Sequence, residues 1–583
     1  MKRLIPVVIA LALMAAIAYF AFWPEYRDYR ERNTYSEEWA DLQEYFNLSG
    51  DEAEVAIILQ DEIIGEQALF WDDTYYFDLA TVHKYFNSRF YVDKREGLLL
   101  YSLPDDTVRT EIGTNLVITK DGEEARGYEV ARYEGETLYI AADFVKEYTN
   151  FTYKGFQNPG RMQVYTEWGT IYRGKIVAAP LSLLTPPDGS DDTAVRILGG
   201  VKSDILTKIV NGTAVTVLEQ METWAKVKTD DGFIGYVENR RLGIVYNEGQ
   251  VPASHYSEPE FASQTRDHLI SLGWHYIGGP AGNDTIREVT RNTKGLNVIS
   301  PTWFFLNDSE GNFTSFASNA YVRAAHEMDL EVWALIENIT YNDEVDMQEL
   351  LSSTSKRAYL IENLIATALE YNIDGINVDF EDLRAETGPH FVQFIRELSI
   401  ACREQELVLS VDNYVPFNFN EFYNRAEQGV FADYIIIMGY DEHYSGSETA
   451  GSVASIGFVQ EGIIRTAEQV PAHKVINGVP FYTRLWETSG ASVSSQALRM
   501  EVAQNWVANR NITPEWDDVT CQNYVEYRDN EGVLHQMWLE DAASLRVKLN
   551  VMKANEIGGV AFWQLGQETA DVWDVVVEYL GVQ

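Results

Sequence analysis

The sequence has few cysteines and few basic residues, and each shortage excludes a class of protein. Its two cysteines, Cys402 and Cys521, form no CxxC pair and no Cys/His cluster, which excludes a disulfide framework and a structural zinc site. Lys and Arg total 45 against 89 Asp and Glu, and the resulting formal charge of -44 repels phosphate backbones. We therefore predict no nucleic-acid partner, no metal and no cofactor.

Length and composition predict several packed domains. The chain of 583 residues is about four times the ~150 residues typical of one domain. Apolar residues make up 46% and charged residues 23%, which is ordinary globular usage. Aromatic residues reach 13%, a content that suits sugar-stacking sites and thick cores alike. Most of the chain should therefore pack into about three or four folded units.

The N-terminus carries a long uncharged apolar run. Leu4 to Trp23 as a helix would span ~30 Å, the thickness of a membrane's hydrocarbon core. Ala16-Ile17-Ala18 fits a signal-peptide cleavage site, but cleavage there would leave the apolar Tyr19 to Trp23 as a new terminus. We predict an uncleaved transmembrane signal anchor over residues 1–25. Basic residues flank both ends of the span, so the outward orientation rests on the predicted chemistry, which needs an extracellular polymer.

Two regions of mixed pattern follow the anchor. Residues 26–50 contain SEEWADLQEYF from Ser36, which predicts a short juxtamembrane helix with a capping serine. Residues 51–168 repeat at an offset of 63, and each copy reads as a strand, a short helix and a strand pair. The matching positions are Tyr76 and Tyr139, Val82 and Val145, Tyr85 and Tyr148, and Asn87 and Asn150. This repeat domain resembles the copper amine oxidase N-terminal-like domain, and a stalk or adaptor is the favoured role.

A linker and a small β-domain come next. Residues 169–190 hold most of TPPDGSDD, a stretch of Pro, Gly and acids that is typical of a linker. Residues 191–246 contain short alternating strands with an Asp231-Gly232 turn, which predicts a small β-barrel. Its run from Trp224 to Val237 resembles the bacterial Src-homology-3-like domain. Binding of cell-wall polymer and a packing spacer both stay open as its role.

Residues 257–583 alternate eight β-type runs with helical stretches. The runs begin with LISLGWHYI and end with GGVAFWQLG, and near-continuous apolar runs are typical of parallel strands buried on both faces. This predicts a (β/α)8 TIM barrel with catalytic groups at the carboxyl ends of its strands. About 75 residues separate the last two runs, which predicts an inserted subdomain. The predicted fold is thus multidomain: a C-terminal TIM barrel preceded by a small β-barrel, an α+β repeat domain and an N-terminal transmembrane helix.

The fourth run, DGINVDFE, places three polar side chains on one face. Asn377, Asp379 and Glu381 are two residues apart, so on a strand they point the same way, and the residues between them are apolar. Burying such a ladder is costly unless its groups are paired or face a wet pocket. A carboxyl beside another carboxyl has a raised pKa, which makes Glu381, at the open end, the candidate proton donor. The alternative is a buried polar network without chemistry.

The same run carries a family resemblance. DGINVDFE resembles the DxxDxDxE signature of glycoside hydrolase family 18, with Asp374, Asp379 and Glu381 at its first, third and fourth acidic positions. Asn377 stands at the second position, where it departs from the family. Where the family has Asp, that residue can share a proton with the middle Asp, whereas Asn offers only an amide. We therefore expect activity with a shifted pH profile, which Asn377→Asp would test.

Two further motifs extend the resemblance. MGYD, at 438–441, resembles the MxYD of the family's sixth strand, and Trp563 resembles the Trp that ends its eighth. The resemblance covers about residues 257–583. It is nearest to exported bacterial members that act on cell-wall glycan.

The resemblance implies substrate-assisted retention, in which the sugar's own acetamide attacks the anomeric carbon. Glu381 would protonate the glycosidic oxygen and later deprotonate water. Asp379 would hold the acetamide N–H, and Tyr440 would donate its hydroxyl to the acetamide oxygen. Trp563 would form the apolar floor under the sugar, and Asp374 would be structural.

Other polar and aromatic residues near strand ends are predicted to bind substrate. Besides Trp563 these are Asn377, Asp441, Trp303, Tyr482, Arg484 and Tyr414. A core position is the alternative for the aromatic members, and a loop salt bridge is the alternative for Asp441 and Arg484. Further candidates at strand ends are Trp333, Glu337 and Asp412.

Together these features predict a membrane-anchored extracellular glycosidase that cuts β-1,4 bonds next to N-acetylglucosamine. Its substrate would be peptidoglycan or a chitin-like polymer, and the Src-homology-3-like domain would contact the wall. The alternative is a non-catalytic, lectin-like glycan-binding protein or a wall scaffold. The presence of Glu381, Asp379 and Tyr440 together favours the enzyme.

Overall fold

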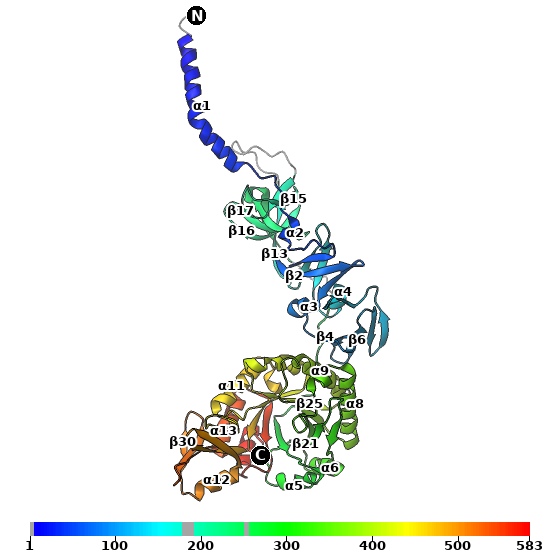
Figure 1. The fold of residues 1–583 in the computed structure, drawn as a ribbon, viewed down its shortest axis with the longest axis vertical. Helices are drawn as coiled ribbons and strands as arrows, with labels where there is room; N and C mark the ends of the chain where they lie inside the picture. The colour runs from blue at the N-terminus through cyan, green and yellow to red at the C-terminus, as the bar shows by residue number, and fades with distance from the viewer. Residues whose placement is uncertain (1–4, 178–191, 250–255, 583) are drawn as a thin grey trace. The chain divides into compact units, whose positions relative to one another are not determined.

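The computed structural model describes residues 5–177, 192–249 and 256–582 (Figure 1). The chain forms two compact units. The first comprises residues 1–90, 112–116 and 125–258, and the second comprises residues 91–111, 117–124 and 259–583.

The first unit begins with the predicted apolar helix. α1 runs over Ile5–Asn33, past the predicted end at Trp23. Its Val8–Asn33 portion is long and apolar enough to cross a membrane and is not covered by other described parts of the chain. The helix therefore meets the length and composition of a membrane span, while its last turns carry charged residues.

The predicted juxtamembrane helix is wrong for most of its length. Only α2, Leu42–Tyr45, is helical, and its cap is Asp41 instead of Ser36. The preceding segment pairs with the start of β15, Ile205–Val210: Ala40 N–H donates to Ile205 O and Ile205 N–H donates to Glu38 O, both at 2.9 Å. An available strand edge thus outweighs the helical spacing of the apolar residues.

The internal repeat appears in the order of elements. The first copy consists of β3 (Thr74–Asp78), α3 (Leu79–Tyr85), β4 (Phe90–Asp93) and β5 (Leu98–Ser102). The second consists of β10 (Thr137–Ala141), α4 (Ala142–Glu147), β11 (Thr152–Phe156) and β12 (Arg161–Tyr165). The strand, helix and strand pair of each copy match the prediction.

The two copies share one sheet through β3 and β10, but the strand pair of the first copy lies outside that sheet, so the predicted domain of 51–168 is divided. The pair β11–β12 joins a seven-stranded sheet, where β12 lies parallel to β1 (Glu54–Leu59). The pair β4–β5 instead begins a five-stranded sheet with β6 (Thr107–Glu111), β7 (Leu116–Thr119) and β8 (Gly122–Ala125). Most of this second sheet belongs to the unit that contains the barrel, because β4 and β5 pack on barrel helices.

The small β-domain starts earlier than predicted. β13, Thr170–Ile176, lies within the predicted linker 169–190 but pairs with β16 (Ala214–Gln220) and β19 (Leu242–Gly249) in a seven-stranded sheet. The buried positions of β13 are only Gly174 and Ile176, so its pairing with two neighbouring strands, and not a local apolar period, explains the difference. Residues 178–190 of the predicted linker lie outside the described residues. The predicted turn at Gly232, with φ 91°, joins β17 (Trp224–Lys228) to β18 (Ile234–Glu238).

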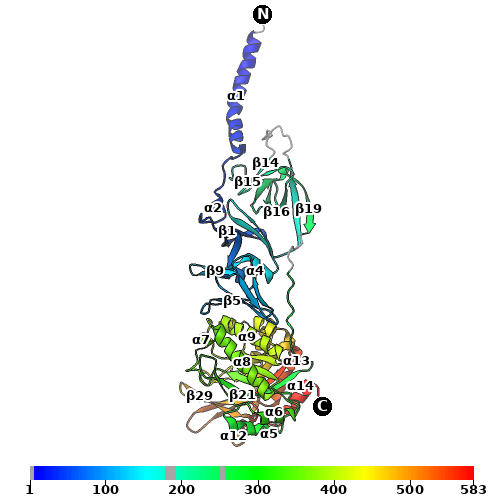
Figure 2. The ribbon, with the colours of Figure 1, turned by 90° about the vertical axis from the view of Figure 1, so that its right-hand side faces the viewer.

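The predicted (β/α)8 barrel is confirmed in the second unit (Figure 2). Its eight parallel strands are β20 (Ile270–His275), β21 (Val298–Leu306), β23 (Glu331–Glu337), β24 (Gly375–Asp379), β25 (Val408–Tyr414), β26 (Tyr434–Met438), β27 (Val475–Pro480) and β33 (Gly559–Trp563). β20 pairs with both β21 and β33, which closes the barrel. Each of the eight predicted runs contains one strand, and β21 alone extends beyond its run, by Phe305 and Leu306.

The barrel has two apolar layers, and β24 faces both. Ile376 and Val378 lie in the outer layer, between the strands and the surrounding helices. Asn377 alternates with them and faces the interior, whose apolar members include Trp274 and Leu335. The period of two along the strand therefore places the polar ladder inside the barrel, as predicted.

The predicted insertion after the seventh strand is also confirmed. It forms a five-stranded antiparallel sheet, ordered β29-β28-β32-β31-β30, with the helix α12 (Met500–Ala508). Its strands are β28 (Tyr482–Ser489), β29 (Ser492–Arg499), β30 (Glu515–Asp517), β31 (Gln522–Arg528) and β32 (Leu534–Leu539). Tyr482 therefore begins the insertion and does not belong to the barrel strand.

The turn between β4 and β5 caps a barrel helix within the second unit. α8, Thr354–Tyr371, begins at Thr354, whose N–H donates to Asp93 Oδ2 at 2.7 Å. The N–H of Ser355 donates to Glu96 Oε1 at 2.8 Å. Two N–H groups in the first turn of this helix, which have no acceptor within the helix, thus donate to carboxylates. The negative charge of these carboxylates also interacts favourably with the positive end of the helix dipole.

A buried ion pair holds the same contact together. Arg357 of α8 donates to both carboxylate oxygens of Glu397 in α9 (Gly388–Glu404), each at 2.8 Å. The Arg357 guanidinium also lies over the ring of Tyr91 in β4, 5.0 Å from its centroid. The first repeat's strand pair is therefore part of the structure that supports the barrel helices.

We predict that Asp93→Ala lowers the free energy of unfolding of the barrel unit by about 1 to 2 kcal/mol, the usual effect of losing a helix cap. Burial raises the pKa of Asp93, but hydrogen bonds from Thr354 and from backbone N–H groups outweigh it, and the pKa lies below its usual value. A carboxyl whose pKa is lower in the folded than in the unfolded protein stabilises the fold while it is ionised, and this stabilisation is lost as the pH falls through the folded pKa. The deficit of Asp93→Ala should therefore shrink in acid.

Differential scanning calorimetry of the full chain at several pH values measures this deficit. Asp105→Ala is the matched control, since Asp105 lies in the same region and makes an exposed ion pair with Lys120. An equal effect of the two substitutions would contradict the capping role.

Candidate active site

The mouth of the barrel holds the two carboxylates that the sequence singles out. Asp379 is the last residue of β24, and Glu381 follows two residues later, beyond the strand. Asn338, which follows β23, fixes the backbone of Glu381 from both sides. Glu381 N–H donates to Asn338 Oδ1 at 2.8 Å, and Asn338 Nδ2 donates to Glu381 O at 2.9 Å. Sequence reasoning missed Asn338, although a polar residue directly after a buried strand was an available signal.

Asp379 is a buried carboxyl with a free oxygen. The residue is 9% exposed, and no group in the described parts of the chain hydrogen-bonds its Oδ1. Burial raises the pKa of Asp379 well above its usual range, and the charges of Glu381, Asp412 and Glu337 raise it further. An unpaired buried carboxyl oxygen at a barrel mouth is suited to accept a donor from a ligand.

Glu381 has the properties of a proton donor. Burial raises the pKa of its carboxyl, and the charges of Asp382, Asp441 and Glu337 act in the same direction. A hydrogen bond from Tyr414 opposes them and lowers the pKa. The net rise keeps a larger fraction of Glu381 protonated than an exposed Glu would have, which general acid catalysis requires.

Tyr440 lies beside these carboxyls, beyond the end of β26. Burial raises the pKa of its hydroxyl well above the usual value, and the charges of Asp379 and Asp412 raise it further. Tyr440 is therefore a neutral hydroxyl that can donate a hydrogen bond. Gly478 makes room for its ring, since a Cβ at that position would lie 3.1 Å from Tyr440 Cε1.

The predicted aromatic floor lies in the barrel interior. Trp563 ends β33, is half-buried and packs edge-on against Trp274, with ring centroids 5.9 Å apart and planes at 62°. Its peptide bond to Gln564 is cis.

Three predicted substrate-binding residues form one cluster at the start of the insertion. Tyr482 Oη donates to Asp441 Oδ1 at 2.6 Å, and an Arg484 guanidinium nitrogen lies 3.7 Å from the same oxygen. Arg484 Nε is buried and has no hydrogen-bond partner among the described residues. The salt bridge that the sequence left open for Asp441 and Arg484 is thus present, and Arg484 keeps one donor free.

The prediction that Trp303 binds sugar is wrong. Trp303 is 0% exposed and donates from Nε1 to Asn283 Oδ1 at 2.8 Å in the outer apolar layer. Trp303 is four residues after Ile299 on β21, so both side chains lie on the same face of the strand, the one that points away from the barrel interior. Trp333 does face the interior, but it is also 0% exposed and stacks on Tyr434.

Asn377 also differs from its predicted role, and Tyr414 has a contact that the sequence did not predict. Asn377 is 0% exposed and beneath the mouth, so it cannot touch substrate, and its amide donates to Asp412 and Ser410 instead of to Asp379. Tyr414 hydrogen-bonds Glu381. Its hydroxyl therefore acts on the candidate acid, which is a more specific contact than stacking on a sugar.

Asp374 lies away from the mouth, just before β24 begins. Its Oδ2 accepts hydrogen bonds from Val332 N–H and from His326 Nε2, both at 2.8 Å. These contacts join the start of β24 to β23 and to α6 (Asn319–His326), which is the environment of a structural residue.

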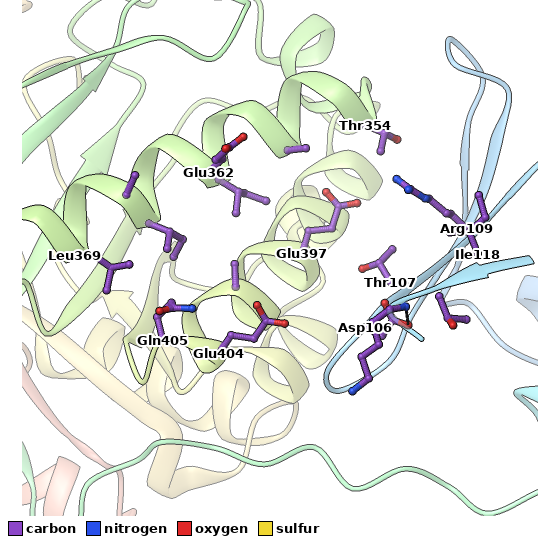
Figure 3. A pocket seen from close by; sticks show the side chains of 17 residues that line it. Asp106, Thr107, Arg109, Ile118, Thr354, Glu362, Leu369, Glu397, Glu404 and Gln405 are labelled. Atoms are coloured by element: carbon purple, nitrogen blue, oxygen red, sulfur yellow. Dashed lines mark hydrogen bonds between the residues drawn. The ribbon is translucent and has the colours of Figure 1, made fainter. Parts of the chain in front are cut away.

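A cavity of about 660 Å³ in the second unit is distinct from this mouth. Figure 3 shows it between the β6–β7 strands, which carry Arg109, and the helices α8 and α9, which carry Glu362 and Glu397. It lies on the outside of the barrel helices, and its lining contains none of the predicted site residues.

Family comparisons agree with two of the predicted domains. Residues 296–568 match the family described as Glycosyl hydrolases family 18, and residues 193–243 match that described as Bacterial SH3 domain. The first match falls on the barrel and the second on the small β-domain.

Curated relatives share the barrel region. The uncharacterized glycosylase YvbX of Bacillus subtilis is 24% identical over 317 residues, which cover 51% of this chain and 91% of that protein. The cortical fragment-lytic enzyme of Bacillus anthracis is 26% identical over 250 residues, covering 42% of this chain and 58% of the relative. Chitinase B of Serratia marcescens is 21% identical over 329 residues, covering 42% and 65%. The chain thus spans less than two thirds of the length of the last two relatives.

Among solved structures, the spore cortex-lytic enzyme SleL of Bacillus cereus aligns with a TM-score of 0.50 at 21% identity. The alignment covers 59% of this chain and 80% of that structure. This likeness supports the fold.

We predict that Tyr414→Phe moves the alkaline limb of the pH–rate profile to higher pH. The Tyr414 hydrogen bond lowers the pKa of Glu381, so its removal lets the proton stay on Glu381 at higher pH. Initial rates on a glycan substrate across a pH series measure the shift. Tyr359→Phe, on the exposed surface of α8, is the matched control. A limb that stays in place or moves to lower pH would contradict this role.

We also predict that Asn338→Ala lowers kcat by about 10²-fold while KM changes little, because a small misplacement of the acid is costly even when substrate still binds. Steady-state kinetics measure the two constants. The control is Asn342→Ala, in the same loop, whose exposed residue is away from Glu381. Equal losses for both variants would indicate general disturbance of the loop.

Proposed function

We propose that the family 18 domain is a retaining glycoside hydrolase that cleaves β-1,4 bonds next to N-acetylglucosamine in peptidoglycan or a chitin-like polymer. The observation that carries the proposal is the pairing of Glu381 and Asp379 at the barrel mouth. Glu381 has a raised pKa, and Asn338 hydrogen-bonds its backbone, while Asp379 has a buried oxygen without a hydrogen-bond partner among the described residues. Such a pair supplies an acid and an anchor at neighbouring positions.

In the proposed reaction Glu381 gives its proton to the glycosidic oxygen as the bond to the anomeric carbon breaks. The acetamide oxygen of the same sugar attacks that carbon, so that a cyclic oxazolinium forms without a protein nucleophile. Asp379 accepts the acetamide N–H and stabilises the positive charge, and Tyr440 donates its hydroxyl to the acetamide oxygen. Water then opens the ring, and its proton returns to Glu381.

Orientation of the acetamide matters at least as much as the proton. An oriented intramolecular attack lowers a barrier by ~7 to 11 kcal/mol. General acid catalysis contributes about 10²- to 10⁴-fold in rate. Asp379 and Tyr440, which hold the acetamide in this proposal, should therefore be as important as Glu381.

The charge of the mouth favours sugars with little negative charge of their own. The loops at 338–346, 380–387, 415–424 and 439–449 carry several Asp and Glu and one Lys or Arg, Arg384. A guanidinium nitrogen of Arg384 lies 4.0 Å from a carboxylate oxygen of Glu386, and both side chains are exposed. Such loops repel an anionic glycan, which supports uncharged stretches of N-acetylglucosamine polymer as the substrate.

The remaining parts suit a protein held at the outer face of a membrane. α1 has the length and composition of a membrane anchor, and the bacterial SH3 domain suits attachment to a cell-wall polymer. The names of the cortical fragment-lytic and chitinase relatives support a wall or chitin-like glycan. The likeness of residues 51–168 to the copper amine oxidase N-terminal-like domain stays a prediction.

The proposal is tested with the full chain, because the barrel helices depend on residues of the first repeat. The detergent-solubilised protein is incubated with purified peptidoglycan and with chitooligosaccharides, and products are identified by mass. We expect new reducing ends from at least one polymer and a loss of about 10²- to 10⁴-fold in Glu381→Gln.

Glu386→Gln is the matched control, an exposed carboxylate in the same loop. Binding of oligosaccharide without release of reducing ends, by wild type and Glu381→Gln alike, would overturn the proposal and identify a lectin.

A further inference from the structure

Asn377 is the centre of a buried hydrogen-bond cluster inside the barrel. Its Oδ1 accepts from Trp274 Nε1 at 2.9 Å and from Ser300 Oγ at 3.2 Å. Its Nδ2 donates to Ser410 Oγ at 3.1 Å and to Asp412 Oδ1 at 2.8 Å. Because an indole N–H can only donate, the amide oxygen must face Trp274 and the amide nitrogen must face Asp412. Asn377 therefore holds Asp412 in place.

Asp412 stands directly beside Asp379. β24 and β25 are parallel, and Val378 lies opposite Val411, so the next register position brings Asp379 opposite Asp412. Neighbouring strands lie ~4.8 Å apart, and opposed residues point to the same face. Both residues are buried, with exposures of 9% and 2%. The barrel thus contains a pair of neighbouring interior carboxyls.

Such a pair holds a proton. Two carboxylates that share a buried site cannot both be ionised at low cost. Burial raises the pKa of Asp412, and the hydrogen bond from Asn377 opposes this rise only in part. The other titratable groups that face the pair are Glu337 from β23, Glu381 beyond β24 and Tyr440 beyond β26.

We infer that Asp412 is a positioning residue that stores the shared proton while Asp379 acts on the substrate, an inference that rests on the proposed function. In the empty site the two carboxyls hold one proton between them. When Asp379 turns toward the acetamide N–H of the sugar, its O–H bond breaks and an O–H bond forms on Asp412. Asp379 then meets the substrate as a carboxylate, and the proton returns when the product leaves.

This role explains the residue types at both positions. An amide takes up no proton near neutral pH, so Asn377 cannot store the proton itself. It can orient Asp412 by donating to one oxygen, which leaves the other oxygen of Asp412 to carry the proton. The second carboxyl of the site is therefore supplied by the neighbouring strand, β25.

A carboxyl–amide exchange tests the inference. Initial rates on the glycan that wild type cleaves are measured across pH for Asp412→Asn, Asn377→Asp and the double variant Asn377→Asp/Asp412→Asn. Asp412→Asn keeps an acceptor for Asn377 but loses the proton store, and we expect kcat to fall about 10²-fold with a changed pH profile. The double variant restores one carboxyl and one amide next to Asp379, and we expect it to recover at least a tenth of the wild-type kcat.

Thermal melting separates this role from a structural one. A carboxyl whose pKa is raised by folding costs stability as pH rises from its unfolded pKa toward its folded pKa, so Asp412→Asn should melt at a higher temperature than wild type at neutral pH. The difference should vanish below about pH 4, where the unfolded carboxyl is also protonated. A well-folded Asp412→Asn with full activity, or a double variant as inactive as Asp412→Asn, would overturn the inference. Absence of hydrolysis by wild type would instead refute the proposed function, and the inference with it.

Discussion

The site depends on keeping several carboxyl groups inside an apolar barrel. Asp379 and Asp412 are buried, and Glu337 and Glu381 are close enough for their charges to act on Asp379. A low dielectric makes each charge costly unless it is protonated, paired or used by a ligand. The fold meets this demand with hydrogen bonds from Asn377, Tyr414 and backbone N–H groups, and by raising carboxyl pKa values. The buried Oδ1 of Asp379, which has no hydrogen-bond partner among the described residues, is left for a ligand to use.

The register of parallel strands turns this constraint into geometry. β23, β24 and β25 place Glu337, Asp379 and Asp412 side by side, because side chains opposed across parallel strands share a face. Glu381 lies beyond the last strand residue, where backbone hydrogen bonds no longer hold it, and Asn338 replaces the missing ladder. The rigid barrel thus supplies the buried Asp379 and Asp412, and the Asn338 side chain holds the partly buried Glu381.

The barrel helices are supported by a segment that is far from them in sequence. Residues 91–111 precede the barrel by more than a domain's length, yet they cap α8 and cover the Arg357–Glu397 ion pair. The repeat of two equivalent copies is therefore divided. The pair β11–β12 joins the seven-stranded sheet, whereas the pair β4–β5 packs on barrel helices. Domain boundaries drawn from sequence similarity alone would remove part of this support.

Local patterns determined the elements whose burial repeats along the chain. Eight apolar runs predicted eight barrel strands, and the period of two in DGINVDFE predicted which residues face the interior, since both depend only on neighbouring residues. Whether a side chain then meets solvent, a carboxyl or a core depends on strands far apart in sequence. The tertiary structure alone therefore decided that Trp303 is core, that Tyr414 binds Glu381, that Asn377 serves Asp412 and that β13 is a strand. Pairing across strands is a long-range interaction, and no local period encodes it.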